Sequence, residues 1–218
     1  MIELSNVHKT YKSGSGPVEV LKGIDLRVEK GDKIGILGAN GAGKSTLIRL
    51  ISGIERPTAG TVRRSMTISW PLAFAGAFQG TLTGIDNIRF ICRIYRKTPE
   101  DVIPYVQEFS QLGRFLYEPV KIYSSGMRAR LAFAMSLMVD FDCYLIDEVV
   151  TVGDERFRAK SEQELFVKRI DRAHIVVSHD RYYLHEHCKR ACILNEGRLH
   201  QFDDIDEAIA FHHKAMLG

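Results

Sequence analysis

The segment KIGILGANGAGKS, residues 33–45, decides how this chain folds. Lys33–Leu37 is an apolar run of the length of a buried β-strand, and Lys44–Ile51 has the apolar spacing of a helix. Between them, Gly38–Ser45 matches the pattern G-x-x-x-x-G-K-[ST] in full. A strand, a glycine-rich turn and a helix in this order predict a loop whose backbone N–H groups surround phosphate oxygens.

The parts of this loop have separate expected roles in holding a nucleotide. The glycines let N–H groups turn toward the phosphates, and the helix N-terminus adds partial positive charge. The ammonium of Lys44 is expected to reach the β- and γ-phosphates, and the hydroxyl of Ser45 to bind Mg²⁺. We expect seven loop residues to bind the nucleotide: Gly38, Asn40, Gly41, Gly43, Lys44, Ser45 and Thr46.

Two further apolar strands are followed by polar residues that suit the same chemistry. Cys143–Ile146 is followed by Asp147 and Glu148, and His179 comes shortly after the apolar run Ile175–Val177. Asp147 would lie beside Mg²⁺ and is a predicted metal ligand. Glu148 points elsewhere, which suits the general base that activates water. His179 would lie at the ligand-binding edge of the sheet, although a lone histidine there is more often structural.

Strands alternate with helices along the chain, which predicts an α/β fold with a mostly parallel sheet. The β-like runs before residue 30 predict an N-terminal antiparallel β subdomain, and Thr61–Trp70 predicts a hairpin around Arg63 and Arg64. The stretch 84–140 is helical in pattern and is expected to form an inserted lobe. We expect a single domain over residues 1–218 with the core of a P-loop NTPase.

Charge and hydropathy limit the classes of partner. The 218 residues hold 30 Lys and Arg against 27 Asp and Glu, a net charge of +3, which is too balanced to indicate nucleic acid. Ser65–Ile85 carries no charge and is long enough to span a bilayer, but glycines and a proline interrupt it. We expect a buried strand followed by a loop there, so that any membrane association comes through a partner.

The four cysteines include no C-x-x-C pair, which favours reduced thiols and a cytoplasmic chain. Cys188 and Cys192 lie near His185 and His187 in the sequence, so a metal site at these residues is the alternative. The N-terminal residues have no apolar core of the kind that a signal peptide needs.

Together, these motifs resemble the nucleotide-binding subunit of an ABC transporter, and the resemblance covers nearly the whole chain. It implies that the nucleotide is ATP and that the chain is an ATPase. The family has a signature sequence at the start of a helix, and YSSGM at 123–127 occupies that place. Ser124 and Gly126 match the residues that contact the γ-phosphate bound to the opposing subunit, whereas Tyr123, Ser125 and Met127 depart from the pattern.

The resemblance also assigns roles to residues outside the loop and the signature. Gln79 is similar to the residue that senses Mg²⁺ and couples to the membrane subunit, which makes it a candidate for catalysis and for the metal. Tyr11 is similar to the aromatic that stacks on adenine, with a core or surface tyrosine as the alternative. Asp154 lies in the region that crosses the dimer interface, and His179 resembles the switch histidine, which completes the catalytic set with Glu148.

The family mechanism implies a homodimer that sandwiches two ATP molecules, an integral-membrane permease as the second partner, and no nucleic acid. The chain would lie at the cytoplasmic face of the inner membrane, attached through its permease. Phe78–Asn87, Asp147–Asp154 and the altered signature resemble the ATPases of capsular polysaccharide export. Exporters of O-antigen or teichoic acid are the near alternatives, and we expect no carbohydrate-binding domain after Gly218.

Classes outside transport fit less well. A P-loop kinase or GTPase would need an acceptor site or an N-K-x-D guanine motif, and the sequence contains no such motif. DNA-repair members of the family place long coiled coils between the two ATP motifs, and the stretch from Lys44 to Asp147 leaves no space for them. Translation members carry two cassettes, whereas this sequence has a single phosphate loop. A binding module without enzymatic activity would lack the base, whereas Glu148 is present.

Overall fold

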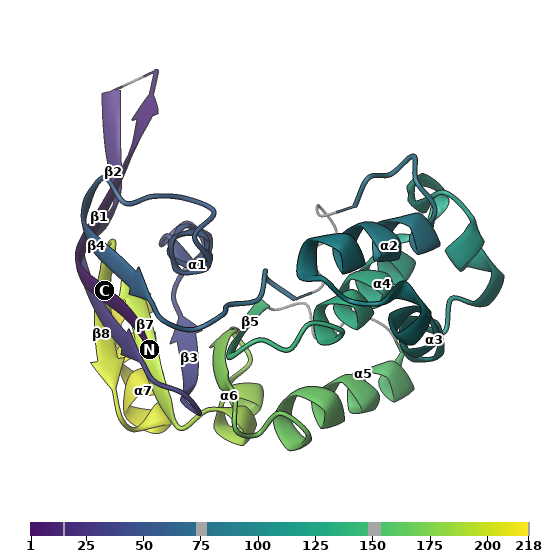
Figure 1. Cartoon of the computed structure of the whole chain (residues 1–218). Coiled ribbons are helices and arrows are strands. Elements are labelled where there is room, and N and C mark those ends of the chain that lie inside the picture. The colour runs from purple at the N-terminus through teal and green to yellow at the C-terminus, as the bar shows by residue number, and fades with distance from the viewer. Residues whose placement is uncertain (15, 73–77, 148–153, 218) are drawn as a thin grey trace. The chain divides into compact units, whose positions relative to one another are not determined.

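The computed structural model of the chain describes residues 1–14, 16–72, 78–147 and 154–217 (Figure 1). These residues divide into two units. Unit 1 comprises Met1–Pro71, Phe141–Glu148 and Ile170–Gly218, and it contains both β-sheets. Unit 2 comprises Leu72–Asp140 and Val149–Arg169, and it contains four α-helices, α2 to α5.

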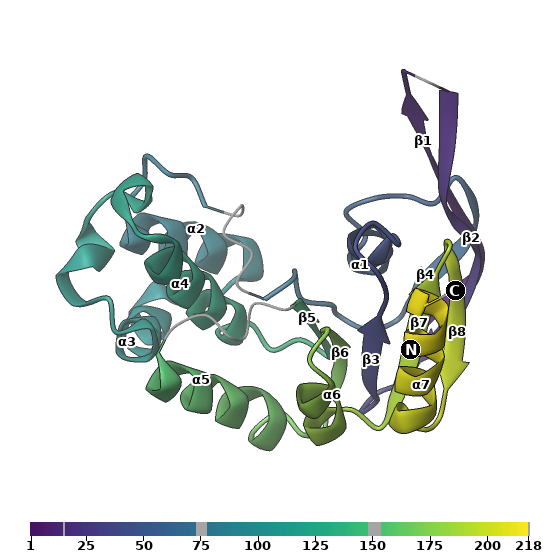
Figure 2. The same ribbon diagram turned by 180° about the vertical axis from the view of Figure 1, so that it is seen from behind.

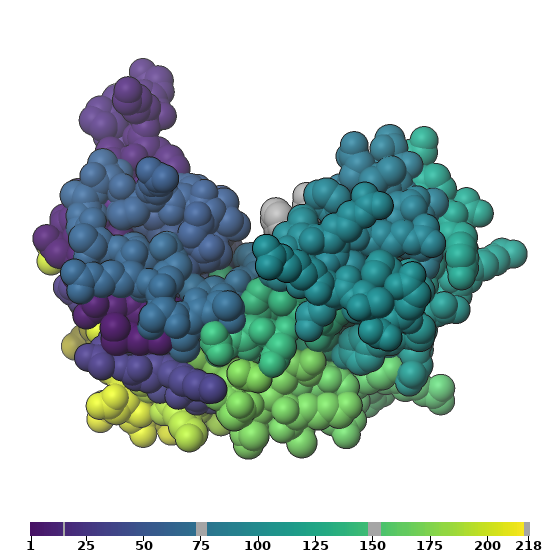
Figure 3. Space-filling view, in the orientation of Figure 1, coloured from purple at the N-terminus to yellow at the C-terminus, as the bar shows by residue number. Residues whose placement is uncertain are grey.

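The N-terminal strands form an antiparallel sheet, which confirms the prediction. Ile2 lies opposite Val28 and Leu4 opposite Leu26, and all four side chains are buried because alternate residues of a strand face the same side. The joined ends of two of the strands project from unit 1 as a ribbon, shown in purple in Figure 3. The sheet has the order β2-β1-β4 and consists of β1 (Ile2–Ser13), β2 (Gly16–Val28) and β4 (Ala59–Arg64).

The hairpin predicted over Thr61–Trp70 is wrong. β4 is an edge strand that pairs with β1, and the chain then crosses to the second sheet of unit 1. The backbone N–H and the hydroxyl of Thr67 both donate to Asp142 Oδ2, at 2.9 and 2.8 Å, and Ile68 forms a parallel bridge to Cys143. These partners lie about 75 residues away in the chain, so a local pattern carries no sign of them.

The second sheet is mostly parallel, which confirms the predicted fold class. Its order is β5-β6-β3-β7-β8, with the first four strands parallel and β8 antiparallel to β7. All residues of the central β3 are buried because helices or strands cover both faces, which explains its continuous apolar run. The five strands are β3 (Lys33–Leu37), β5 (Cys143–Asp147), β6 (Ala173–Val177), β7 (Arg190–Asn195) and β8 (Arg198–Phe202).

One hydrophobic core joins the two sheets of unit 1 through α1, which buries Leu47, Leu50 and Ile51 in it. At the other end of the chain, α7 lies against β7 and β8, as Figure 2 shows from behind. The ring of Phe211 is 4.8 Å from His200 and 5.2 Å from Phe202, measured between centroids. The helices of unit 1 are α1 (Lys44–Ser52), α6 (Arg181–His187) and α7 (Ile205–Leu217).

Unit 2 is built around aromatic side chains contributed by three helices. The rings of Phe109, Phe133 and Phe157 lie between 5.4 and 5.8 Å apart, measured between centroids, and all three are buried. A π-helical turn, Gln163–Val167, continues the helix Glu155–Glu162. The four α-helices are α2 (Gly84–Tyr95), α3 (Pro99–Ser110), α4 (Ser125–Leu137) and α5 (Glu155–Glu162), and two 3₁₀ turns span Gly113–Tyr117 and Val120–Ile122.

The described residues also show how long and apolar the helices are and in what state the cysteines are. None of the helices in these ranges is long and apolar enough to cross a lipid bilayer. All four cysteines are buried free thiols, and burial raises the pKa of Cys188 and of Cys192 to about 12. Among the described residues, no three His, Cys, Asp or Glu side chains gather as a metal site would require.

The buried carboxylate of Glu164 gives a prediction for the stability of unit 2. Its two oxygens pair with Lys168 at 2.5 Å and Arg169 at 2.7 Å, and its side chain is 8% exposed. We expect Glu164→Ala to lower the free energy of unfolding by about 3 kcal/mol, because it removes the carboxylate that pairs with a mostly buried guanidinium. Denaturant titration measures this loss.

A matched control is available two residues earlier on the same helical segment. Glu162 pairs with Arg158 at 3.1 Å on the surface, and we expect Glu162→Ala to cost less than about 0.5 kcal/mol. Equal losses in the two variants would show that the buried pair carries no special share of the stability.

Candidate functional site

The loop Gly38–Ser45 connects the carboxyl end of β3 with the start of α1. Two of its glycines are required by their surroundings. A Cβ on Gly38 would lie 2.4 Å from the backbone oxygen of Leu194 in β7, closer than any side chain tolerates. Gly43 precedes α1 with φ 107°, a left-handed conformation that favours glycine. The loop therefore lies closer to the sheet than other residue types would permit.

The N-terminus of α1 faces the loop without a side-chain cap, because Gly43 at the N-cap has no side chain. The first N–H groups of a helix lack partners within the helix, and they carry the positive end of its dipole. Leu47 already donates its N–H to the oxygen of Gly43, at 2.9 Å, so helical geometry begins with the first turn. These N–H groups suit an anion such as a phosphate.

The ammonium of Lys44 lies over the same loop. Its Nζ donates to the carbonyl oxygens of Gly38, at 2.7 Å, and of Ala39, at 3.1 Å. These two bonds fold the long side chain back, so its positive charge is held at the loop instead of extending into solvent. A phosphate bound there would meet a positioned cation in addition to the backbone N–H groups.

Asp147 lies at the same cavity as the loop, although the two are about a hundred residues apart in the sequence. Asp147 ends β5 opposite Val177 of β6, and Ile36 of β3 lies opposite the same Val177, so β5 and β3 reach the same edge of the sheet. The cavity has a volume of about 480 Å³ and is lined by Val20, Asn40, Gly41, Gly43, Lys44, Ser45, Thr46 and Asp147.

The oxygens in this cavity fit a magnesium nucleotide. Ser45 contributes a hydroxyl from an exposed side chain, and Asp147 contributes a carboxylate. Mg²⁺ prefers oxygen ligands and is commonly bound through one or two protein oxygens together with phosphates and water. The donor set at the loop therefore matches the predicted ligand without any further protein residue.

His179 lies at a different hollow of unit 1. It follows β6 and the buried Ser178, whose hydroxyl accepts the N–H of Asp180 at 3.0 Å. Its side chain is exposed, and it is not among the described residues that line the phosphate cavity. The hollow has a volume of about 450 Å³ and is lined by His179, Asp180, Arg181, Tyr182, His185, Asp206 and Ile209.

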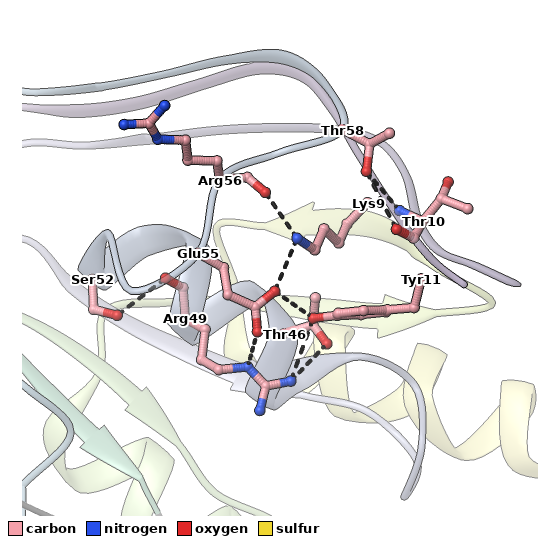
Figure 4. Close-up of polar contacts among 9 residues, drawn as sticks. All are labelled: Lys9, Thr10, Tyr11, Thr46, Arg49, Ser52, Glu55, Arg56 and Thr58. Carbon is pink, nitrogen blue, oxygen red and sulfur yellow. Dashed lines mark hydrogen bonds and ion pairs between the residues drawn. The ribbon is translucent and has the colours of Figure 1, made fainter. Parts of the chain in front are cut away.

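Tyr11 lies in a polar cluster beside α1, half-buried near the far end of β1 (Figure 4). Its hydroxyl donates to Glu55 Oε2 at 2.6 Å, and this bond is the main cause that lowers the pKa of the Glu55 carboxyl. Arg49 of α1 pairs with the other carboxylate oxygen of Glu55 at 2.7 Å. Tyr11 is therefore neither a core side chain nor a freely exposed one.

Gln79 belongs to unit 2, where Asn87 fixes its backbone. The N–H of Gln79 donates to Asn87 Oδ1 at 3.0 Å, and Asn87 Nδ2 donates back to the Gln79 oxygen at 3.2 Å. Asn87 is 3% exposed, and it also donates to the oxygen of Thr83 at 2.9 Å, which anchors it on α2. The Gln79 side chain itself is exposed.

The signature segment leads into α4, with Ser124 as the N-cap. The exposed Ser124 accepts the N–H of Met127 at 3.2 Å. A Cβ on Gly126 would lie 4.0 Å from Ser124 Oγ, which is ordinary van der Waals contact. Tyr123, which departs from the family pattern, is buried against Gly84, and its hydroxyl donates to the oxygen of Phe115. Tyr123 is 3% exposed and therefore acts as a packing anchor, and this burial raises its pKa to about 12.

Two predicted residues remain to be placed. Asp154 is the N-cap of α5 and accepts the N–H of Phe157 at 2.9 Å, and its side chain is exposed. Glu148, the predicted base, lies outside the described residues, as do the residues up to Gly153.

Sequence reasoning missed Val20, which lines the cavity from β2. The apolar run that contains Val20 indicates nothing beyond a strand.

Comparisons with known proteins agree with this geometry. The family model described as ABC transporter matches residues 21–151. The chain is 59% identical over 214 residues to the ATP-binding protein BexA of Haemophilus influenzae, covering 98% of this chain and 99% of BexA. It is 58% identical over 213 residues to the capsule polysaccharide export ATP-binding protein CtrD of Neisseria meningitidis serogroup B, with the same shares covered.

A solved structure shares the fold. The dimeric structure of an ATP-binding cassette in a post-hydrolysis state, bound to ADP and Pi, matches with a TM-score of 0.75 at 23% identity. The match covers 92% of this chain and 98% of the solved one. The likeness confirms the predicted architecture of a nucleotide-binding cassette, with its antiparallel β subdomain and mostly parallel sheet.

The contact between Gly38 and Leu194 generates a prediction for the loop. We expect Gly38→Ala to lower the free energy of unfolding by about 2 kcal/mol, because the added Cβ meets a backbone oxygen that belongs to a sheet strand. The displaced loop should also lose nucleotide binding. Gly14→Ala is the control, since a Cβ there meets nothing within 4 Å. Wild-type nucleotide affinity in Gly38→Ala would contradict the requirement for close approach.

Proposed function

We propose that this chain, which belongs to the ABC transporter family and is an ATPase of that family, powers the export of a capsular polysaccharide through a separate permease in the membrane. The observation that carries the ATPase part is the cavity at which Lys44, Ser45 and Asp147 meet at the carboxyl edge of the sheet. The polysaccharide part is supported by the likeness to CtrD along almost the whole of both chains.

In this proposal the triphosphate of ATP lies in the glycine-rich loop. Backbone N–H groups of the loop and of α1 hold the phosphate oxygens, and Lys44 neutralises charge on the β- and γ-phosphates. Asn40, Gly41 and Thr46, which line the cavity, complete the cradle. Mg²⁺, held by Ser45 and Asp147, supplies charge neutralisation on the phosphates when bound.

Hydrolysis then requires a base and residues that orient the attacking water. Glu148 follows directly after Asp147 in the sequence and is the proposed base. Gln79 and His179 are proposed to complete the catalytic set. The bonds between Asn87 and Gln79 fix the backbone from which the Gln79 side chain projects, which supports a positioning task for that segment.

The proposed assembly is a head-to-tail homodimer. In it, Ser124 and Gly126 of one subunit face the γ-phosphate held by the loop of the other, and Asp154 crosses the interface. Ser124 is exposed at the start of a thirteen-residue helix, where the helix dipole favours an anion. The bond from Met127 uses Ser124 Oγ as an acceptor, so the hydroxyl can still donate its proton to a phosphate oxygen.

The permease is the proposed route by which ATP use becomes transport. Because the affinity for ATP is higher in the closed dimer, binding shifts the population toward closure and hydrolysis releases it. The membrane subunit would follow this cycle, and the chain would lie peripherally at the cytoplasmic face of the inner membrane. The permease, rather than this chain, would select the sugar.

The role of Lys44 in this proposal can be tested by binding. We expect Lys44→Ala to weaken ATP affinity by about a hundredfold, because removal of a cation from a charge-assisted phosphate contact costs about 2–3 kcal/mol. Lys30→Ala removes an exposed lysine of the same unit and should leave affinity unchanged. Calorimetry with a slowly hydrolysed ATP analogue measures both, and equal affinities would remove Lys44 from the site.

Export itself is tested in cells whose only copy of the protein carries Glu148→Gln. We expect this variant to bind ATP and to turn it over at least tenfold more slowly, because the water lacks its base. Capsular polymer should then accumulate inside the cells with little at the surface, measured by fractionation and immunostaining. Normal surface polymer together with slow turnover would support the ATPase activity but contradict the proposed role in capsule export.

A further inference from the structure

The cluster around Tyr11 joins three segments of unit 1. Glu55 lies at its centre: Oε2 accepts the hydroxyl of Tyr11 at 2.6 Å and pairs with Lys9 at 3.0 Å, and Oε1 pairs with Arg49 at 2.7 Å. The carboxylate thus connects two residues of β1 with α1 (Figure 4). Glu55 and Lys9 are largely screened from solvent, with side chains 23% and 14% exposed.

The same cluster reaches the phosphate cavity. Nη2 of Arg49 lies 3.5 Å from the Tyr11 hydroxyl and 3.4 Å from Thr46 Oγ1, so it lies between the two. Thr46 is buried and lines the cavity with Lys44. Arg49 therefore connects the Tyr11 side chain with Thr46 at the start of α1, beside the phosphate loop.

Only part of the Tyr11 ring is available to a ligand. Nζ of Lys9 lies over the ring, 5.0 Å from its centroid, and it is held there by Glu55 and by the carbonyl oxygen of Arg56 at 2.9 Å. Figure 4 shows Lys9 on one side of the ring and the hydroxyl end directed at Glu55. A base that stacks on Tyr11 would therefore use the face opposite Lys9.

We propose that Glu55 is the positioning residue of the adenine site: it holds the Tyr11 hydroxyl so that the ring stands at a fixed distance from the phosphate loop. This rests on the proposed function, in which Tyr11 stacks on the base. A short bond to a carboxylate is stronger than one between neutral groups, so it restricts the ring to one orientation. Stacking on a preorganised ring then costs less ordering entropy than stacking on a mobile one.

The experiment compares two ligands that differ by the base. The affinity of the full chain is measured for a slowly hydrolysed ATP analogue and for inorganic tripolyphosphate, both with Mg²⁺. The variants are Tyr11→Ala, Tyr11→Phe, Glu55→Ala and Glu55→Gln. Glu29→Gln is the matched control, because it neutralises a surface carboxylate that pairs with Arg27, at 2.6 Å, and does not contact Tyr11.

We expect Tyr11→Ala to weaken binding of the ATP analogue by about tenfold, the loss of a stacked base, and to leave tripolyphosphate unchanged. Tyr11→Phe keeps the ring but loses the bond, and it should weaken only the analogue, by about threefold. Glu55→Ala should do the same. Glu55→Gln should recover part of this loss, because its amide oxygen still accepts the hydroxyl. Combining Tyr11→Phe with Glu55→Ala should add nothing further.

Other outcomes distinguish the adenine role of Tyr11 from the positioning role of Glu55. If Tyr11→Ala weakens the analogue while Tyr11→Phe and Glu55→Ala do not, the base stacks on Tyr11 without the tether, and the positioning role is overturned. If Tyr11→Ala binds the analogue as the wild type does, the adenine role of Tyr11 falls, and the positioning role falls with it. Equal weakening of both ligands in Glu55→Ala would instead show a general effect on the loop. Because Tyr11→Phe retains every apolar contact, it keeps the test valid if Glu55→Ala folds poorly.

Discussion

The close approach of the phosphate loop to the end of β7 is the contact on which the rest of the site depends. With no Cβ on Gly38, the chain can turn directly under the Leu194 oxygen and place Gly43 at the start of α1. The N-terminus of the helix and the folded-back Lys44 are consequences of that turn. Parallel pairing then brings Asp147 to the same edge, because β5 and β3 both pair with β6.

The parts of the molecule that could be predicted are those whose sequence signal is local. The apolar run of β3, the glycines after it and the start of α1 lie within a few residues of each other, and parallel strands then fix which edge carries ligands. Ser124 is a helix cap in a sequence position where a cap is expected, so the start of α4 could also be predicted.

The parts that could not be predicted depend on partners far away in the chain. The hairpin expected over Thr61–Trp70 fails because Thr67 finds Asp142 and Ile68 finds Cys143, which no local pattern indicates. The bond between Tyr11 and Glu55 spans 44 residues, and Glu55 by itself looks like any acidic residue after a helix. Val20 likewise enters the cavity only because β2 passes beside Gly43.

The most direct test of the account is an experimental structure of the full chain with a slowly hydrolysed ATP analogue and Mg²⁺. The account predicts the triphosphate in the cavity lined by Lys44, Ser45 and Asp147, with the base against the face of Tyr11 that Lys9 does not cover. A nucleotide bound elsewhere, for example in the hollow beside His179, would contradict it.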